Sequence, residues 1–103
     1  LFTQGVYFGA YEGERVIAAG GTHALTPAHR VAVLGHILTA PEARRQGYAA
    51  AITAALVATL LHQGFSTIVL NVMEDNHAAC SVYQRLGFQT RYRLVTGKAT
   101  ILR

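Results

Sequence analysis

The sequence predicts a mixed β-sheet flanked by helices, of the α/β or α+β type. Short runs rich in Val, Ile and aromatic residues, typical of strands, alternate with two longer proline-free runs that end at glycine, as helices do. Their order is strand, strand, strand, helix, strand, helix, strand, strand. With 103 residues, 51% of them hydrophobic and 14% charged, the chain can bury one core. We therefore expect one domain over residues 1–103.

The first three strands are expected before residue 40. Glu12-Gly13-Glu14 has the composition of a hairpin turn, Gly20-Gly21 should end or bulge the second strand, and Gly35 should mark a bulge or the close approach of another group. The expected segments are strands over Val6 to Tyr11 and Arg15 to Ala19, a loop over Thr22 to His29 that contains Pro27, and a third strand over Val31 to Thr39.

The remaining elements alternate between helix and strand. The first helix is nearly apolar all round, so we expect it to be deeply buried against a sheet and to be closed by a left-handed Gly64. The short link that follows it implies parallel strands on either side. The expected segments are a helix over Gly47 to Gln63, a strand over Ser66 to Val72, a helix over Asn76 to Leu86 stopped by Gly87, and a hairpin of Phe88 to Val95 and Ala99 to Arg103 around Gly97-Lys98.

Composition and charge narrow the function classes. A formal net charge of +4 favours anionic partners but does not choose among phosphates, nucleotides and nucleic acids. Cys80 is the one cysteine, so no internal disulfide can form, and we expect a cytoplasmic protein. The longest apolar-rich run, Ala49 to Leu61, is shorter than the roughly 20 residues that span a bilayer, so we expect no membrane protein. The chain starts at Leu1 rather than Met, and we expect that Leu1 is not the natural start.

A candidate anion site lies between the third strand and the long helix. Its sequence is Arg44-Arg45-Gln46-Gly47-Tyr48-Ala49, placed where free backbone N–H groups and the positive end of a helix dipole converge. Gly47 would let a phosphate approach closely, and Ala49 keeps the first helical turn uncrowded. The alternative is that Thr39-Ala40-Pro41-Glu42 forms a capping box and Gly47 is merely a loop glycine.

Two segments in this order resemble the GCN5-related N-acetyltransferase (GNAT) family. Arg44 to Ala49 matches the form Gln/Arg-x-x-Gly-x-Gly/Ala of that family's acetyl-CoA loop. The segment Asn76 to Phe88 matches a later family pattern of Asn, Ala, Tyr and Gly-Phe at the usual spacing. The resemblance covers about Val31 to Phe88, and the hairpin before it also fits. The strand and helices that precede this hairpin in the family are missing, so we expect an N-terminally truncated domain.

The resemblance implies an acetyl-CoA-dependent N-acetyltransferase. Such an enzyme moves an acetyl group to a primary amine of a small molecule, peptide or protein, by direct attack of the amine on the thioester. The resemblance places the cofactor contacts on the end of the third strand, the anion loop and the second helix. These residues are Ile37, Leu38, Thr39, Arg44, Arg45, Gln46, Gly47, Tyr48, Ala49, Ala50, Asn76, Ala79 and Tyr83.

Asn76 and Tyr83 are the expected polar contacts of the second helix. Seven positions apart, they share one helix face at a separation of roughly 10 Å. The resemblance implies that Asn76 bonds the pantetheine arm and that Tyr83 is the general acid, since a Tyr hydroxyl with a reference pKa of about 10 can protonate a leaving thiolate. The alternatives are a core aromatic for Tyr83 and a helix N-cap for Asn76, and both roles can hold for Asn76.

The candidate base is His36, because histidine titrates near neutrality and this one lies near the family's reacting centre. Its alternative is a strand histidine that faces away. Glu74 is a lesser candidate, and Cys80, with no paired His, is typical of a buried small hydrophobe. The resemblance places donors for the developing negative charge on the backbone near Ile37 to Thr39. Neither His pairs nor a Cys cluster indicates a metal site.

Two other functions compete with this one. A module that binds acyl-CoA without catalysis would differ only in its lack of turnover. A nucleic-acid-binding module is suggested by the net charge and the C-terminal arginines, but these are scattered and no aromatic-basic motif accompanies them. The strand over Val6 to Tyr11 is an open edge in this interpretation, which makes a homodimer a further hypothesis.

Overall fold

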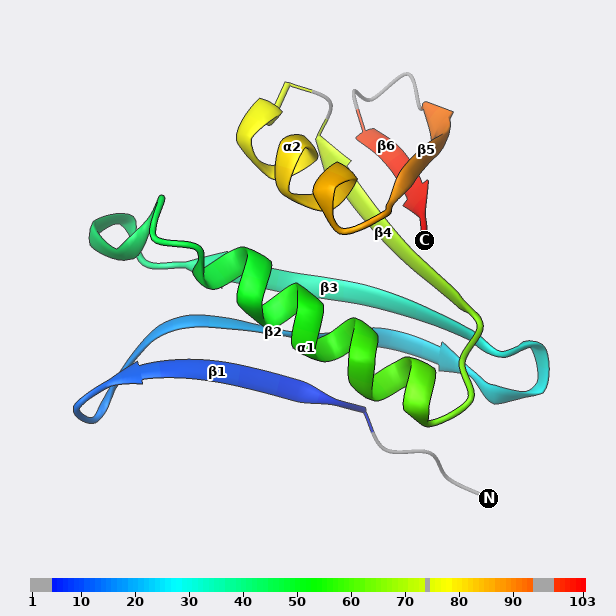
Figure 1. Cartoon of the computed structure of the whole chain (residues 1–103), viewed down its shortest axis with the longest axis horizontal. Helices are drawn as coiled ribbons and strands as arrows, with labels where there is room; N and C mark the ends of the chain where they lie inside the picture. The colour runs from blue at the N-terminus through cyan, green and yellow to red at the C-terminus, as the bar shows by residue number, and fades with distance from the viewer. Residues whose placement is uncertain (1–4, 74, 94–97) are drawn as a thin grey trace.

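The computed structural model of the chain describes residues 5–73, 75–93 and 98–103 and confirms a mixed sheet with helices (Figure 1). Its strands are β1 (Tyr7–Glu12), β2 (Arg15–Thr26), β3 (Val31–Thr39), β4 (Thr67–Met73), β5 (Gln89–Arg93) and β6 (Lys98–Leu102). Its helices are α1 (Tyr48–His62) and α2 (His77–Arg85), with short 3₁₀ turns η1 (Pro27–His29) and η2 (Pro41–Ala43). None of the helices in this described part is long and apolar enough to cross a membrane.

The six strands form one sheet in the order β1-β2-β3-β4-β6-β5. β3 and β4 pair in parallel, as predicted from the α1 crossover between them, and the other described pairs are antiparallel. The terminal hairpin of β5 and β6 is confirmed, although its predicted Gly97 turn lies outside the described residues. The last strand in the sequence, β6, lies beside β4 and separates it from β5.

β2 is longer than the sequence predicts. It runs on to Thr26, so the loop expected over Thr22 to His29 is wrong for its first five residues, and only η1 leaves the strand. The physical reason is that irregularities at Ala19/Gly21 and Thr22/Ala24 bend the strand without ending its pairing with β3. The bulge expected at Gly20-Gly21 is therefore confirmed.

Gly20 and Gly35 lie where atoms of a neighbouring element come very close to the backbone. A Cβ added at Gly20 would lie 2.9 Å from side-chain atoms of Ile37 in β3 and of Ile52 in α1, so α1 packs very close to the sheet here. A Cβ at Gly35 would lie 3.0 Å from the Cβ of His23, which confirms the close approach predicted for that position. Both glycines therefore bring neighbouring elements closer together.

The end of α1 follows the predicted glycine stop. Gly64 has a φ of 97°, its N–H donates to the Leu61 carbonyl at 3.1 Å, and the N–H of Phe65 donates to the Leu60 carbonyl at 3.0 Å. This is the Schellman arrangement, and the buried side chains of Leu60 and Phe65 belong to the same hydrophobic core. The turn thus directs the chain from α1 into β4.

α1 lies across the face of β1, β2 and β3 (Figure 1). Its buried side chains are Ile52, Thr53, Leu56, Val57 and Leu60. The predicted deep burial of this helix against a sheet is confirmed, and Ala51, Ala54 and Ala58 are exposed on its other side. A sheet covers one side of a helix, and alanine tolerates the other side at little cost.

Candidate functional site

β3 and β4 separate halfway along their length. Their parallel pairing begins at Val31↔Thr67 and ends at Leu34↔Leu70, whereas β3 continues to Thr39 and β4 to Met73. Beyond Leu70, β4 stays paired with β6 on its other side. Figure 1 shows β4 leaving β3 at this point. The last five residues of β3 therefore have an edge that β4 does not cover, and they include Ile37 to Thr39, where the resemblance places backbone donors.

The candidate anion site over Arg44 to Ala49, called the anion loop below, leads from this opening into α1. Arg45 and Gly47 have positive φ values of 65° and 85°, while Gln46 between them does not. Alternation of this kind turns successive N–H groups toward one side, as in backbone anion-binding nests. A Cβ added at Gly47 would meet nothing within 4 Å, so the space beside the Cα of this residue is open.

The first turn of α1 has no side-chain cap and no acidic residue. The N–H of Ala51 donates to the Gly47 carbonyl at 3.0 Å, and the amides of Tyr48, Ala49 and Ala50 precede this first helical bond. These unpaired amides and the helix dipole favour an anion at this end of α1. The capping-box alternative is wrong, because Thr39 belongs to β3 and the residue before η2 is Ala40, which has no side-chain cap bond.

The side chains of the loop are exposed and differ in their contacts. Arg44 donates from Nε to the Thr39 carbonyl at 3.3 Å, and Gln46 donates from Nε2 to the Glu42 carbonyl at 3.3 Å. The carboxylate of Glu42 forms an ion pair with Arg15 at the start of β2. Sequence reasoning missed this pair, because no local pattern links Arg15 to Glu42.

The first turn of α2 is capped by its own sequence. The Oδ1 of Asn76 accepts a hydrogen bond from the N–H of Ala79 at 3.2 Å, which confirms the N-cap alternative for Asn76. The cap uses the amide oxygen of Asn76, and contact of the same side chain with a ligand stays a prediction. The N–H of Ala79 already donates to Asn76. The predicted contact of Ala79 with the cofactor stays a prediction.

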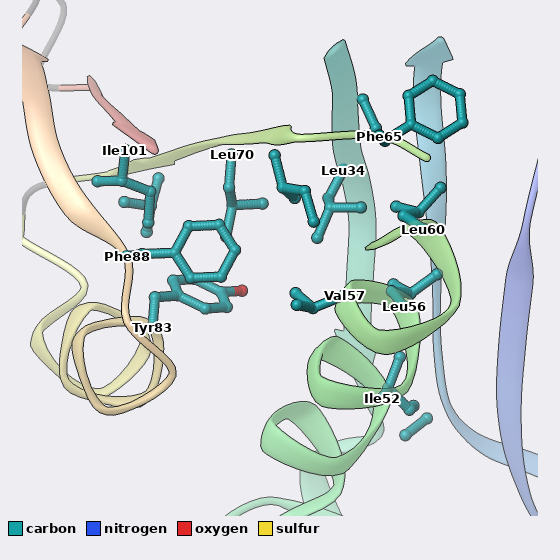
Figure 2. Close-up of a cluster of buried hydrophobic side chains, with 14 residues drawn as sticks. Leu34, Ile52, Leu56, Val57, Leu60, Phe65, Leu70, Tyr83, Phe88 and Ile101 are labelled. Carbon is teal, nitrogen blue, oxygen red and sulfur yellow. The ribbon is translucent and has the colours of Figure 1, made fainter. Parts of the chain in front are cut away.

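Tyr83 is the buried side chain of α2 (Figure 2). Its ring is 7% exposed and packs edge-to-face on Phe88, with ring centroids 5.9 Å apart and an interplanar angle of 63°. Its hydroxyl points toward Val57 of α1. Burial raises the pKa of this hydroxyl above its usual value, and the neighbouring Cys80 raises it further. The hydroxyl is therefore protonated at neutral pH, as a general acid must be, and it is also a core aromatic as the alternative held.

The remaining candidates for catalysis or metal binding are His36, Glu74 and Cys80. His36 lies on β3, but its side chain, like Glu74, lies outside the described part of the structure, so both stay predictions. Cys80 is a free, partly buried thiol whose Sγ lies 3.8 Å from the Met73 carbonyl. Within the described ranges, no three His, Cys, Asp or Glu side chains gather as a metal site would require.

The sequence and the fold of the chain match known proteins. Residues 2–88 match the family described as the acetyltransferase (GNAT) family. The chain belongs to the GNAT family. The resemblance seen in Arg44 to Ala49 and in Asn76 to Phe88 is thereby confirmed at the level of the family.

Individual relatives agree with this assignment. The chain is 38% identical over 87 residues to mycothiol acetyltransferase of Streptomyces scabiei, which covers 82% of this chain and 27% of that protein. Its fold is similar to PaiA N-acetyltransferase of Thermoplasma acidophilum in complex with coenzyme A, with a TM-score of 0.82, 15% identity, and coverage of 96% of this chain and 60% of that one. It is also similar to the ribosomal-protein-S18-alanine N-acetyltransferase of Escherichia coli, with a TM-score of 0.76, 24% identity, and coverage of 99% and 68%. The chain thus spans about a quarter of its curated relative.

Proposed function

We propose that this GNAT chain binds acetyl-CoA and transfers its acetyl group to a primary amine. The observation that carries the proposal is the open N-terminus of α1, where the amides of Tyr48, Ala49 and Ala50 precede the first helical bond and no side chain caps them. A diphosphate is the part of coenzyme A that suits such a helix end. The similarity to mycothiol acetyltransferase supports transfer to an amine of a small molecule.

The residues at the site fit such a ligand. The exposed loop over Arg44 to Gly47 would hold the diphosphate, with Arg45 adding charge. The opening between β3 and β4 would take the pantetheine arm, next to the backbone of Ile37, Leu38 and Thr39. Bound acetyl-CoA supplies a thioester, whose carbonyl carbon is the electrophile.

The protein's own groups would then orient the reactants and move protons. Amine attack forms the new C–N bond and breaks the C–S bond, so one proton must leave the amine and one must reach the departing sulfur. We assign the second proton to the hydroxyl of Tyr83, whose raised pKa keeps it protonated. We assign the first to His36, directly or through water, or to solvent. N–H groups of β3 near Ile37 to Thr39 would meet the charge on the carbonyl oxygen.

The test is a binding and turnover experiment on the chain. A thermal-shift and calorimetric titration with coenzyme A and acetyl-CoA should show saturable binding, and a panel of small-molecule, peptide and protein amines should release free thiol. Tyr83→Phe should keep cofactor affinity and lose about a hundredfold or more in kcat. No binding by the unaltered chain would reject the cofactor assignment, and unchanged kcat in Tyr83→Phe would remove that residue as the acid.

The same experiment separates the second candidate, an acyl-CoA-binding domain without catalysis. That candidate is favoured by the burial of Tyr83, which is 7% exposed and packed on Phe88, since a general acid must reach the leaving group. A domain of this kind would bind acyl-CoA but would release no free thiol with any of the amines.

Compartment and assembly complete the proposal. The free thiol of Cys80 is compatible with the reducing cytoplasm, which cell fractionation would test. β1 is an outer strand of the sheet, so a homodimer would pair two copies of this edge. Light scattering at several concentrations would detect that dimer, and a constant monomer mass would exclude it.

A further inference from the structure

The segment between β3 and α1 depends on side chains for its position. Its backbone is tied to β2 at its start, where the N–H of Ala40 donates to the Ile17 carbonyl at 2.7 Å. The single turn of η2 follows, with a bond of 2.9 Å from Ala43 to Ala40 and a longer one of 3.4 Å from Arg44 to Pro41. The next backbone bond of the segment is at the Gly47 carbonyl, so the residues that form the anion loop lie between these two anchors.

Glu42 connects this loop to the rest of the sheet. Its carbonyl accepts the hydrogen bond from Gln46, the residue directly before Gly47, and its carboxylate pairs with Arg15 at the beginning of β2. Arg44 donates to Thr39, the last residue of β3, from which the segment leaves. Among the side-chain contacts of the described loop, the pair with Arg15 is thus the one that reaches a strand other than β3.

We propose that Arg15 and Glu42 are positioning residues for the diphosphate site. The pair holds η2 against the hairpin of β1 and β2, and through Gln46 it sets the orientation of the peptide groups on either side of Gly47. Arg15 also neutralises a carboxylate that would otherwise repel an anion bound at the neighbouring helix end. This inference rests on the proposed function, because it assigns the pair a role in coenzyme A affinity.

The exposure of the pair separates this role from a role in stability. The side chains of Arg15 and Glu42 are 62% and 50% exposed, and ion pairs this exposed contribute little to folding. Loss of the pair should therefore leave the melting temperature nearly unchanged while it weakens coenzyme A binding. If the pair served only the fold, its loss would lower the melting temperature and leave coenzyme A binding unchanged.

The experiment is a charge-swap cycle. Arg15→Glu and Glu42→Arg are made singly and together, and the Kd of coenzyme A is measured by calorimetry beside the KM and kcat for acetyl-CoA. Arg15→Glu should weaken binding about fivefold or more, because it removes the anchor and adds repulsion. The double variant should return to within about twofold of the unaltered chain, and kcat should stay constant throughout.

Arg30→Glu is the matched control. It makes the same change of charge at the turn between η1 and β3, at the opposite end of the sheet from η2 (Figure 1), and should leave the Kd unchanged. Equal weakening by Arg30→Glu, no weakening by Arg15→Glu, or no recovery in the double variant would each overturn the positioning role while the proposed function stands. Absence of coenzyme A binding by the unaltered chain would instead reject the proposed function, and this inference with it.

Discussion

α1 and α2 each follow a strand that borders the opening between β3 and β4, but their first turns are held differently. α2 begins with Asn76, whose side chain accepts a bond from the helix's own backbone. α1 begins with a left-handed Gly47 and has neither a side-chain cap nor an acid in its first turn. The missing cap leaves backbone donors for a ligand, and this difference supports the proposal that the diphosphate binds at α1.

The helices also differ in what they contribute to the core. α1 buries five side chains against the sheet, whereas α2 buries Tyr83 alone. A helix that buries five side chains can lack an N-cap, because the loss of a cap lowers the free energy of unfolding by only about 1 kcal/mol. The shorter α2 has less burial to rely on and keeps its cap.

The largest expected effect tests the difference in core packing. Leu56→Ala removes a side chain with no exposed surface and should lower the free energy of unfolding by about 2–5 kcal/mol. Leu86→Ala makes the same change at the partly buried end of α2 and should cost less than half as much. Urea unfolding measures both, and equal losses would show that the helices share the core evenly.

The next effect tests the open end of α1. Ala50→Glu adds an acid to the first turn, which should slightly favour the helix but repel a diphosphate. Coenzyme A affinity should fall by more than about tenfold with no loss of melting temperature. Ala58→Glu, on the exposed side of the same helix, controls for net charge. Similar affinities for the two variants would place the diphosphate elsewhere.

A smaller effect tests the cap of α2. Asn76→Ala should lower the free energy of unfolding by about 1 kcal/mol, because the N–H of Ala79 loses its acceptor. Asn76→Asp keeps the acceptor and should retain stability. Chemical denaturation measures the stability of both variants. An unchanged denaturation midpoint in Asn76→Ala would mean that the cap bond contributes nothing to stability.

The smallest effect concerns pH. Because burial raises the folded-state pKa of Tyr83 above the unfolded value of 10.0, its contribution to stability is complete below pH 10.0. The contribution is lost as the pH rises through the folded-state pKa. Stability should therefore fall in alkaline solution, and Tyr83→Phe should reduce that fall. The unfolding free energy measured from pH 8 to 11 gives the comparison, in which parallel curves would contradict the assignment.

The role of Asn76 shows where sequence reasoning about the site ends. The pattern Asn76 to Phe88 identified the family and its helix, yet an asparagine before a helix suits both a cap and a ligand contact. The bond to Ala79 establishes the cap. For Tyr83 the sequence predicted the helix face, while the packing on Phe88 and the raised pKa depend on neighbours brought in by folding.

The sequence by itself determined the features that depend on a few consecutive residues. These are the bounds of β3, the span of α1 and its glycine stop at Gly64. Turn geometry and helix periodicity are local, so the residue types suffice. Only the tertiary structure decided that β2 continues past its glycines, that β6 lies beside β4, and that Arg15 pairs with Glu42. Each of these contacts joins segments distant in sequence, and their energy comes from partners that no local pattern contains.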